Sequence, residues 1–177
     1  MTQAEIKQLI QKQRTFFHSD ATLDVEYRIH ALQKLKACIL KYENEINIAI
    51  RADLGKCAFE SYMCETGLVL SELTYMLKHT RKFSKERTVR TPLAQFHSRS
   101  YQKPSPYGVT LIMSPWNYPF MLTIEPLVDA LAAGNTAILK PSAYSAHTTA
   151  LISRMIQECF DEKYVAVVTG GREENNF

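Results

Sequence analysis

The chain has 177 residues, of which 46% are hydrophobic and 22% charged, and its net charge is +3. This composition is ordinary for a globular protein and gives enough length for one domain or for part of a larger one. The mild charge does not require a polyanionic partner, and no apolar run approaches the ~20 residues of a membrane span. The cysteines lack metal-site or CxxC spacing, which indicates reduced, packed thiols in a cytoplasmic protein; they are Cys38, Cys57, Cys64 and Cys159.

Residues 1–90 are predicted to form a helical segment that packs on a core. Glu60 and Glu65 lie on its last apolar pattern, and because nothing pairs them as an acid and a base, we expect both to be solvated. Apolar side chains recur at the three- and four-residue spacing of helix faces; the main sets are Ile6, Leu9 and Ile10, then Ile29, Leu32, Leu35 and Ile39, then Phe59, Tyr62, Met63, Leu70, Leu73 and Leu77.

A basic stretch, KHTRKFSKERTVR, occupies residues 78–90. Such a stretch could contact nucleic acid, but few aromatic side chains are interleaved in it for stacking on bases. A basic helix end followed by a solvated linker explains it better. We therefore predict no nucleic-acid partner.

Residues 91–104 are predicted to form a polar β-ribbon outside the core. In TPLAQFHSRSYQKP both alternating sets of positions carry polar side chains, and prolines bound the stretch at Pro92 and Pro104. Polar strands of this kind often pair with another subunit. The ribbon is therefore our candidate for an oligomer contact.

Residues 105–177 change to alternating strands and helices. The apolar runs at 108–114, 136–140 and 164–171 are typical of buried strands, and Ser145 is a candidate cap for the second intervening helix. This order predicts an α/β fold in which N-terminal helices and a polar β-ribbon lead into a partial doubly wound, Rossmann-like parallel sheet. The first strand is central in that topology, so we expect it to leave one edge unpaired here.

Ligands of such sheets bind outside the carboxyl ends of the strands. Three segments follow the predicted strands, SPWNYP, KPSAY and TGGREENN, and the GxGxxG dinucleotide fingerprint is absent. A nucleotide site would therefore use another design. Lys140 ends the second strand, where its ammonium either donates to ribose hydroxyls or reaches water; its position alone does not decide between the two.

The motifs PWNYPF and AAGNTAILKPS together resemble the aldehyde dehydrogenase superfamily. The longer runs TPLAQF, YGVTLIMSPWNYPFMLTIEPL and VVTGGREENN resemble the N-terminal portion of its class 3, fatty and aromatic aldehyde branch. The resemblance covers the whole chain and is strongest over residues 91–171. It implies an NAD- or NADP-dependent enzyme that oxidises an aldehyde to a carboxylate, with a homo-oligomeric assembly.

The resemblance assigns an oxyanion role to Asn117. In this family an asparagine at this turn stabilises the negative charge that develops on the aldehyde oxygen when a cysteine thiolate attacks. Pro115 and Pro119 restrict the backbone on both sides of Asn117, so the amide is aimed before the reaction begins. Without the resemblance, an asparagine that satisfies the backbone of its own turn would be the better interpretation.

Cofactor roles follow from the same resemblance. Ser114, Pro115 and Trp116 are expected to line the nicotinamide side of the cofactor, and Lys140 with Ser142, in the KPS motif, the adenosine ribose. Many members read KPSE, whose glutamate binds ribose hydroxyls, but here Ala143 takes that place. Because a missing carboxylate would not repel a 2′-phosphate, we predict relaxed or NADP-tolerant binding.

The family's nucleophilic cysteine and general-base glutamate are expected in a region beyond these motifs. Burial on the apolar face of its helix should raise the pKa of Cys159, and the other three cysteines precede the cofactor strands on helical patterns. We therefore predict that this chain alone is catalytically silent. The alternative is a non-enzymatic binding or assembly module derived from such an enzyme.

Overall fold

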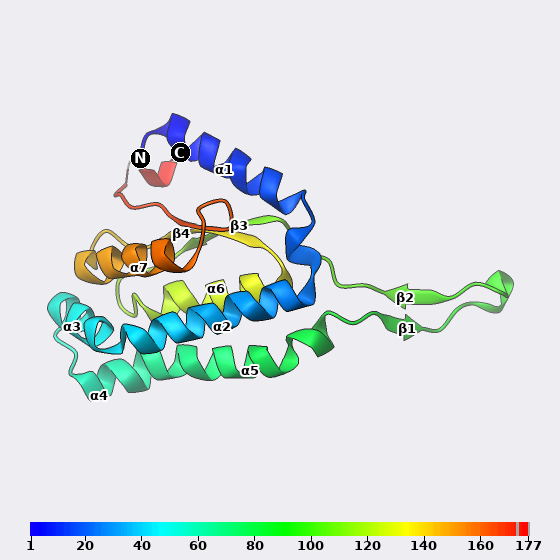
Figure 1. The fold of residues 1–177 in the computed structure, drawn as a ribbon, viewed down its shortest axis with the longest axis horizontal. Helices are drawn as coiled ribbons and strands as arrows, with labels where there is room; N and C mark the ends of the chain where they lie inside the picture. The colour runs from blue at the N-terminus through cyan, green and yellow to red at the C-terminus, as the bar shows by residue number, and fades with distance from the viewer. Residues whose placement is uncertain (173, 177) are drawn as a thin grey trace.

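Helices cover both faces of a small parallel sheet, and a long two-stranded ribbon projects from this body (Figure 1). The computed structural model describes residues 1–172 and 174–176. Helix α1 lies on one face of the sheet, while α6 and α7 lie on the other, with α2, α3 and α5 outside them (Figure 1). This arrangement confirms the predicted α/β class.

The N-terminal helices follow the predicted apolar periodicity. Leu32, Leu35 and Ile39 of α2 are almost completely buried in the main core, as their shared helix face requires. The helices are α1 (Gln3–Phe17), α2 (Val25–Lys41), α3 (Glu43–Leu54), α4 (Ala58–Ser61) and α5 (Gly67–Phe83), and a π-helical turn, Tyr62–Thr66, joins α4 to α5.

The parallel sheet has the strand order β3-β4-β5. Its elements are β3 (Val109–Met113), α6 (Met121–Ala133), β4 (Thr136–Lys140), α7 (Ala146–Cys159) and β5 (Val165–Val167). Strand β4 is buried along its whole length, with Leu139 packed in the α6 and α7 core and Ile138 packed under α1. Neighbouring side chains of a strand point to opposite faces of the sheet. Because helices cover both faces of β4, the strand needs apolar side chains on each of them.

Strand β3 is an edge strand. Within the described residues it pairs with β4 alone, in the register Val109 to Thr136, and its side chains Leu111 and Met113 are exposed. The unpaired edge that the sequence predicted is therefore confirmed.

The N-terminus of α7 is capped from another helix, not by the predicted Ser145. Both carboxylate oxygens of Asp53, on α3, accept backbone N–H groups of α7, from His147 at 3.0 Å and Thr148 at 2.7 Å. The hydroxyl of Ser145 instead donates to the Ser142 carbonyl at 3.3 Å. An ionised carboxylate is a stronger partner than a hydroxyl for the positive end of a helix, which explains the exchange.

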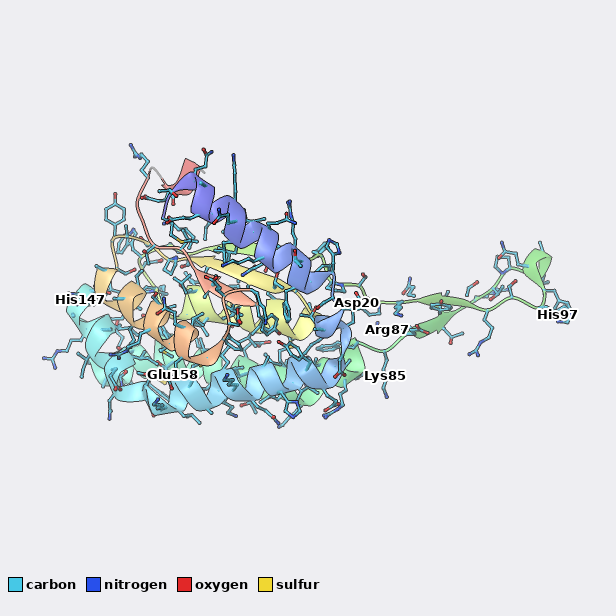
Figure 2. All side chains as sticks on the ribbon, turned by 45° about the horizontal axis from the view of Figure 1, so that its top comes forward. Asp20, Lys85, Arg87, His97, His147 and Glu158 are labelled. Carbon is cyan, nitrogen blue, oxygen red and sulfur yellow. The ribbon has the colours of Figure 1, made fainter. Side chains whose placement is uncertain are left out.

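The ribbon is present, and its second strand lies within the predicted residues 91–104, but its first strand precedes them. Strand β1 (Arg87–Val89) pairs antiparallel with β2 (Ser100–Gln102), and a short 3₁₀ turn, Leu93–Gln95, lies in the segment between them. His97 lies at the far end of the ribbon (Figure 2) and has a positive φ of 79°. A strand with polar residues on both faces has no buried side to fix its register, so alternation misplaced the first strand.

Asp129 on α6 is an unfavourable carboxylate at neutral pH. Burial, then the nearby charges of Glu72 and Glu125, raise the pKa of Asp129 to about 6 from its usual 3.8. Since the pKa of Asp129 is higher in the folded chain than in the unfolded chain, folding favours the protonated form. The contribution of Asp129 to the free energy of unfolding is therefore fully present below pH 4 and is lost as the pH rises through 6.

We expect Asp129→Asn to stabilise the chain at pH 8 and to have little effect at pH 4. The gain should be less than about 1 kcal/mol, because Asp129 is only partly removed from solvent, which still screens its charge. Urea unfolding at both pH values measures it, with the exposed Glu60→Gln as the matched control. An equal gain in the free energy of unfolding at both pH values would show that the charge of Asp129 is not the cause of the effect.

Candidate functional site

The loop that follows β3, Ser114 to Phe120, is fixed at both of its ends. The Ser114 N–H donates to the carbonyl of Lys140, at the end of β4, over 3.3 Å. The Ser114 hydroxyl lies 2.5 Å from the hydroxyl of Thr123 on α6, and Thr123 in turn donates to the Pro119 carbonyl at 2.6 Å. These bonds hold the loop at the carboxyl end of the sheet, where the sequence predicted a ligand site.

Asn117 lies in the exposed middle of this loop. Its side chain is not packed in the core, and its carbonyl accepts a hydrogen bond from the Lys56 ammonium at 3.0 Å. Pro115 is exposed beside it, and Trp116 is 54% exposed. The loop therefore presents an amide and an indole at its surface, while Pro119 and Phe120 are buried and anchor its far end.

Glu65 lies buried beneath this loop, so the prediction that it is solvated is wrong; Glu60 is exposed as expected. One carboxylate oxygen of Glu65, Oε2, accepts the N–H of Phe120 at 2.9 Å and of Met121 at 3.3 Å. Its other oxygen, Oε1, accepts from Lys56 Nζ at 2.7 Å. Backbone N–H groups at a helix start favour an anion, and here that anion belongs to the protein.

Lys56 connects Glu65 to the loop. Its side chain is 10% exposed, and its ammonium donates both to Glu65 and to the carbonyl of Asn117. The same nitrogen lies 4.0 Å from the centre of the Tyr118 ring, a favourable position for a cation–π contact. A single buried ammonium thus contacts two successive residues of the loop.

The π-helical turn explains why Glu65 points inward. Its wider turn changes which helix face is buried, so Phe59, Tyr62 and Met63 are exposed, although the sequence predicted a buried face. Gly67 closes this turn, because a Cβ there would lie 2.7 Å from the carbonyl oxygen of Tyr62. Such turns inside helices often accompany functional sites.

Lys140 is bound to backbone carbonyls at the end of β4. Its residue is buried, and its ammonium donates to the carbonyl of Gly170 at 2.8 Å and to that of Pro141 at 3.4 Å. An ammonium has three N–H donors, so one remains for another acceptor. Together with the Ser114 bond, these contacts join the ends of all three strands of the parallel sheet.

Ser142 and its neighbours form an exposed turn after β4. The Ser142 carbonyl accepts from Thr149 at 2.9 Å, and its hydroxyl accepts the N–H of Tyr144 at 3.2 Å. Ala143 and Tyr144 are exposed at the surface of this turn. The carboxylate of Glu174, whose pKa is lowered by backbone N–H bonds including that of Gly171, lies in the segment that follows β5.

The cysteines are free thiols in different surroundings. Cys38 and Cys159 are buried, and their mutual hydrogen bond together with burial raises the pKa of Cys159, as predicted. Cys57 is exposed in front of α4 and Cys64 is half-buried, so the expectation of packed thiols is wrong for Cys57. Among residues 1–172 and 174–176 no His, Cys, Asp and Glu side chains gather as a metal site, and no helix is long and apolar enough to cross a membrane.

Comparison with known proteins gives one consistent result. A family model described as "Aldehyde dehydrogenase family" matches residues 1–176. The 4,4'-diaponeurosporen-aldehyde dehydrogenase of Staphylococcus aureus is 42% identical over 169 residues, which cover 96% of this chain and 37% of that protein. Aldehyde dehydrogenase family 3 member A2 of Rattus norvegicus is 35% identical over 165 residues, covering 93% and 34%.

Solved structures agree with these relatives. The structure described as "Substrate bound state of Staphylococcus Aureus AldH" superimposes with a TM-score of 0.94 at 42% identity, over 96% of this chain and 37% of that chain. The chain therefore spans little more than a third of the length of the relatives that it matches.

Proposed function

The chain belongs to the aldehyde dehydrogenase family, and on this premise we propose that it supplies the N-terminal, cofactor-binding part of an NAD(P)-dependent enzyme that oxidises an aldehyde to a carboxylate. The observation that carries the proposal is the anchored loop at the carboxyl end of β3, which presents Asn117 at its surface. The nucleophile and the general base would come from the other part of such an enzyme. This chain alone would therefore not convert an aldehyde to a carboxylate.

The Asn117 amide would act on the aldehyde oxygen. When a thiolate adds to the carbonyl carbon, the π electrons move to that oxygen, and an N–H donor held in place stabilises the charge. Losing one such donor typically costs on the order of 3 kcal/mol of transition-state stabilisation. The exposed side chain of Asn117, on a loop whose backbone is fixed, suits this task.

The residues at the strand ends fit a dinucleotide. The third N–H of Lys140 and the hydroxyl of Ser142 are donors suited to ribose oxygens, while Ser114, Pro115 and Trp116 would line the nicotinamide side. A dinucleotide held by these residues would supply the hydride acceptor that oxidation of an aldehyde requires.

We expect the enzyme to bind NADP within a hundredfold of NAD. Ala143 is exposed beside Ser142 and carries no carboxylate to repel a 2′-phosphate. Each dinucleotide is titrated into a complete enzyme that contains this chain, and the quenching of protein fluorescence gives its dissociation constant. The ratio of the two dissociation constants tests the prediction. An NAD preference above a hundredfold would contradict the proposal for Ala143.

The second candidate function is an assembly module, which the ribbon favours. The side chains of Leu93 and Phe96 are exposed on the segment between its strands, far from the body. We propose that this segment contacts a second copy in a homo-oligomer. The four free cysteines agree with a reducing, cytoplasmic compartment.

A chimaera tests the two functions against each other. This chain replaces the aligned third of the Staphylococcus aureus enzyme, which supplies the rest of the protein. We expect aldehyde-dependent reduction of NAD or NADP, at a rate within about tenfold of the unmodified enzyme. A chimaera that folds and oligomerises without turnover would instead support the assembly module.

A further inference from the structure

We propose that Lys56 and Glu65 are positioning residues for the Asn117 amide: together they fix the backbone of the loop that carries it. The inference rests on the proposed function for the catalytic consequence, but the effect on the loop can be measured without it. Neither residue lies in the motifs PWNYPF and AAGNTAILKPS.

Lys56 contacts the middle of the loop, and Glu65 contacts its C-terminal end. Lys56 donates to the Asn117 carbonyl at 3.0 Å and lies under the Tyr118 ring, while Glu65 accepts the N–H groups of Phe120 and Met121. The salt bridge of 2.7 Å joins the two anchors. The chain therefore fixes the loop both at Asn117 and where α6 begins.

These hydrogen bonds restrict the orientation of the loop backbone at Asn117. A carbonyl held by a buried ammonium restricts rotation of the Asn117 peptide, and the start of α6 cannot shift while its first N–H groups are bound to Glu65. An oxyanion donor must be held to within a fraction of an ångström, and small displacements reduce catalysis steeply. Two buried charges in contact with the loop backbone meet that requirement.

A purely structural role would make a different prediction. Buried ion pairs often contribute little net stability, and replacing both partners with apolar residues of similar volume is frequently neutral, whereas removing one partner is harmful. The double variant Lys56→Met/Glu65→Leu therefore removes the anchors without leaving a buried charge. A readout of loop motion taken well below the melting temperature then separates loss of position from loss of stability.

Trp116 provides the readout, because it is the only tryptophan in the chain and precedes Asn117 directly. The decay of its fluorescence anisotropy reports motion of the loop, and it can be measured on this chain without the rest of an enzyme. The matched control is the exposed pair Arg81 and Glu26, which bridges α5 and α2 at 2.7 Å, changed to Arg81→Met/Glu26→Leu. A second variant, Lys56→Gln, keeps an amide donor for the loop but leaves the Glu65 carboxylate without its ammonium partner.

We expect the double variant Lys56→Met/Glu65→Leu to fold but to melt below the parent chain, because the N–H groups of Phe120 and Met121 lose their acceptor. Its Trp116 anisotropy should gain a fast component that the control pair lacks, with Lys56→Gln in between. In the chimaera, kcat should fall at least about 10-fold with KM within about twofold.

Unchanged Trp116 anisotropy in both Lys56→Gln and the double variant would overturn the proposal. So would an unchanged kcat in a chimaera that is active before the change. If the unmodified chimaera has no activity, the proposed function fails, and the anisotropy still decides whether the pair fixes the loop.

Discussion

Replacing Asn117 with alanine is expected to lower kcat of the chimaera by about 10²–10³-fold while changing KM little. The amide would bind the oxygen only as charge develops on it, so its loss weakens the transition state more than the bound aldehyde. The exposed side chain makes no core contact whose loss would unfold the protein. Steady-state kinetics with a saturating dinucleotide measure both constants.

Two further variants make the Asn117 test specific. Asn44, on α3, is also exposed, so Asn44→Ala makes the same chemical change away from the loop and should leave kcat within about twofold. Asn117→Asp should be at least as harmful as Asn117→Ala, because a carboxylate repels a developing oxyanion. A kcat that survives Asn117→Ala would remove the oxyanion role from this residue.

The body of the fold was predictable because burial leaves a periodic signature. On α2, Leu32, Leu35 and Ile39 share one face and are buried. The apolar centre of β4, residues 137–139, lies between two layers of helices, as its composition required. The loop after β3 was also placed correctly, since the carboxyl end of a parallel strand is where such sheets bind ligands.

The features that periodicity misplaced depend on distant contacts. Glu65 meets Phe120, 55 positions away, and nothing local distinguishes it from a solvated glutamate. The π-helical turn adds a change of phase that a regular helical pattern does not contain. Ser61, Glu65 and Thr66 are buried although none of them is apolar, so a search for apolar periodicity could not find them.

Phe120→Ala should be the most destabilising change at the site, by about 3–5 kcal/mol. The ring is completely buried in the main core at the point where the loop enters α6, so its removal leaves a cavity as well as losing apolar burial. The cavity lies directly after Pro119 and beside the N–H that Glu65 accepts, so the anchor of the loop should weaken with the core.

The same substitution at an exposed phenylalanine isolates the effect of burial. Phe59 is 75% exposed on α4, so Phe59→Ala removes the same atoms without opening a cavity and should change the unfolding free energy by less than about 0.5 kcal/mol. Urea unfolding followed by circular dichroism gives both values, with an unchanged m-value as the sign that the denatured state is unaffected. Equal losses for the two variants would mean that Phe120 does not hold α6 to the core. The loop would then be held mainly by its polar contacts, those of Ser114 and Thr123 together with those of Lys56 and Glu65.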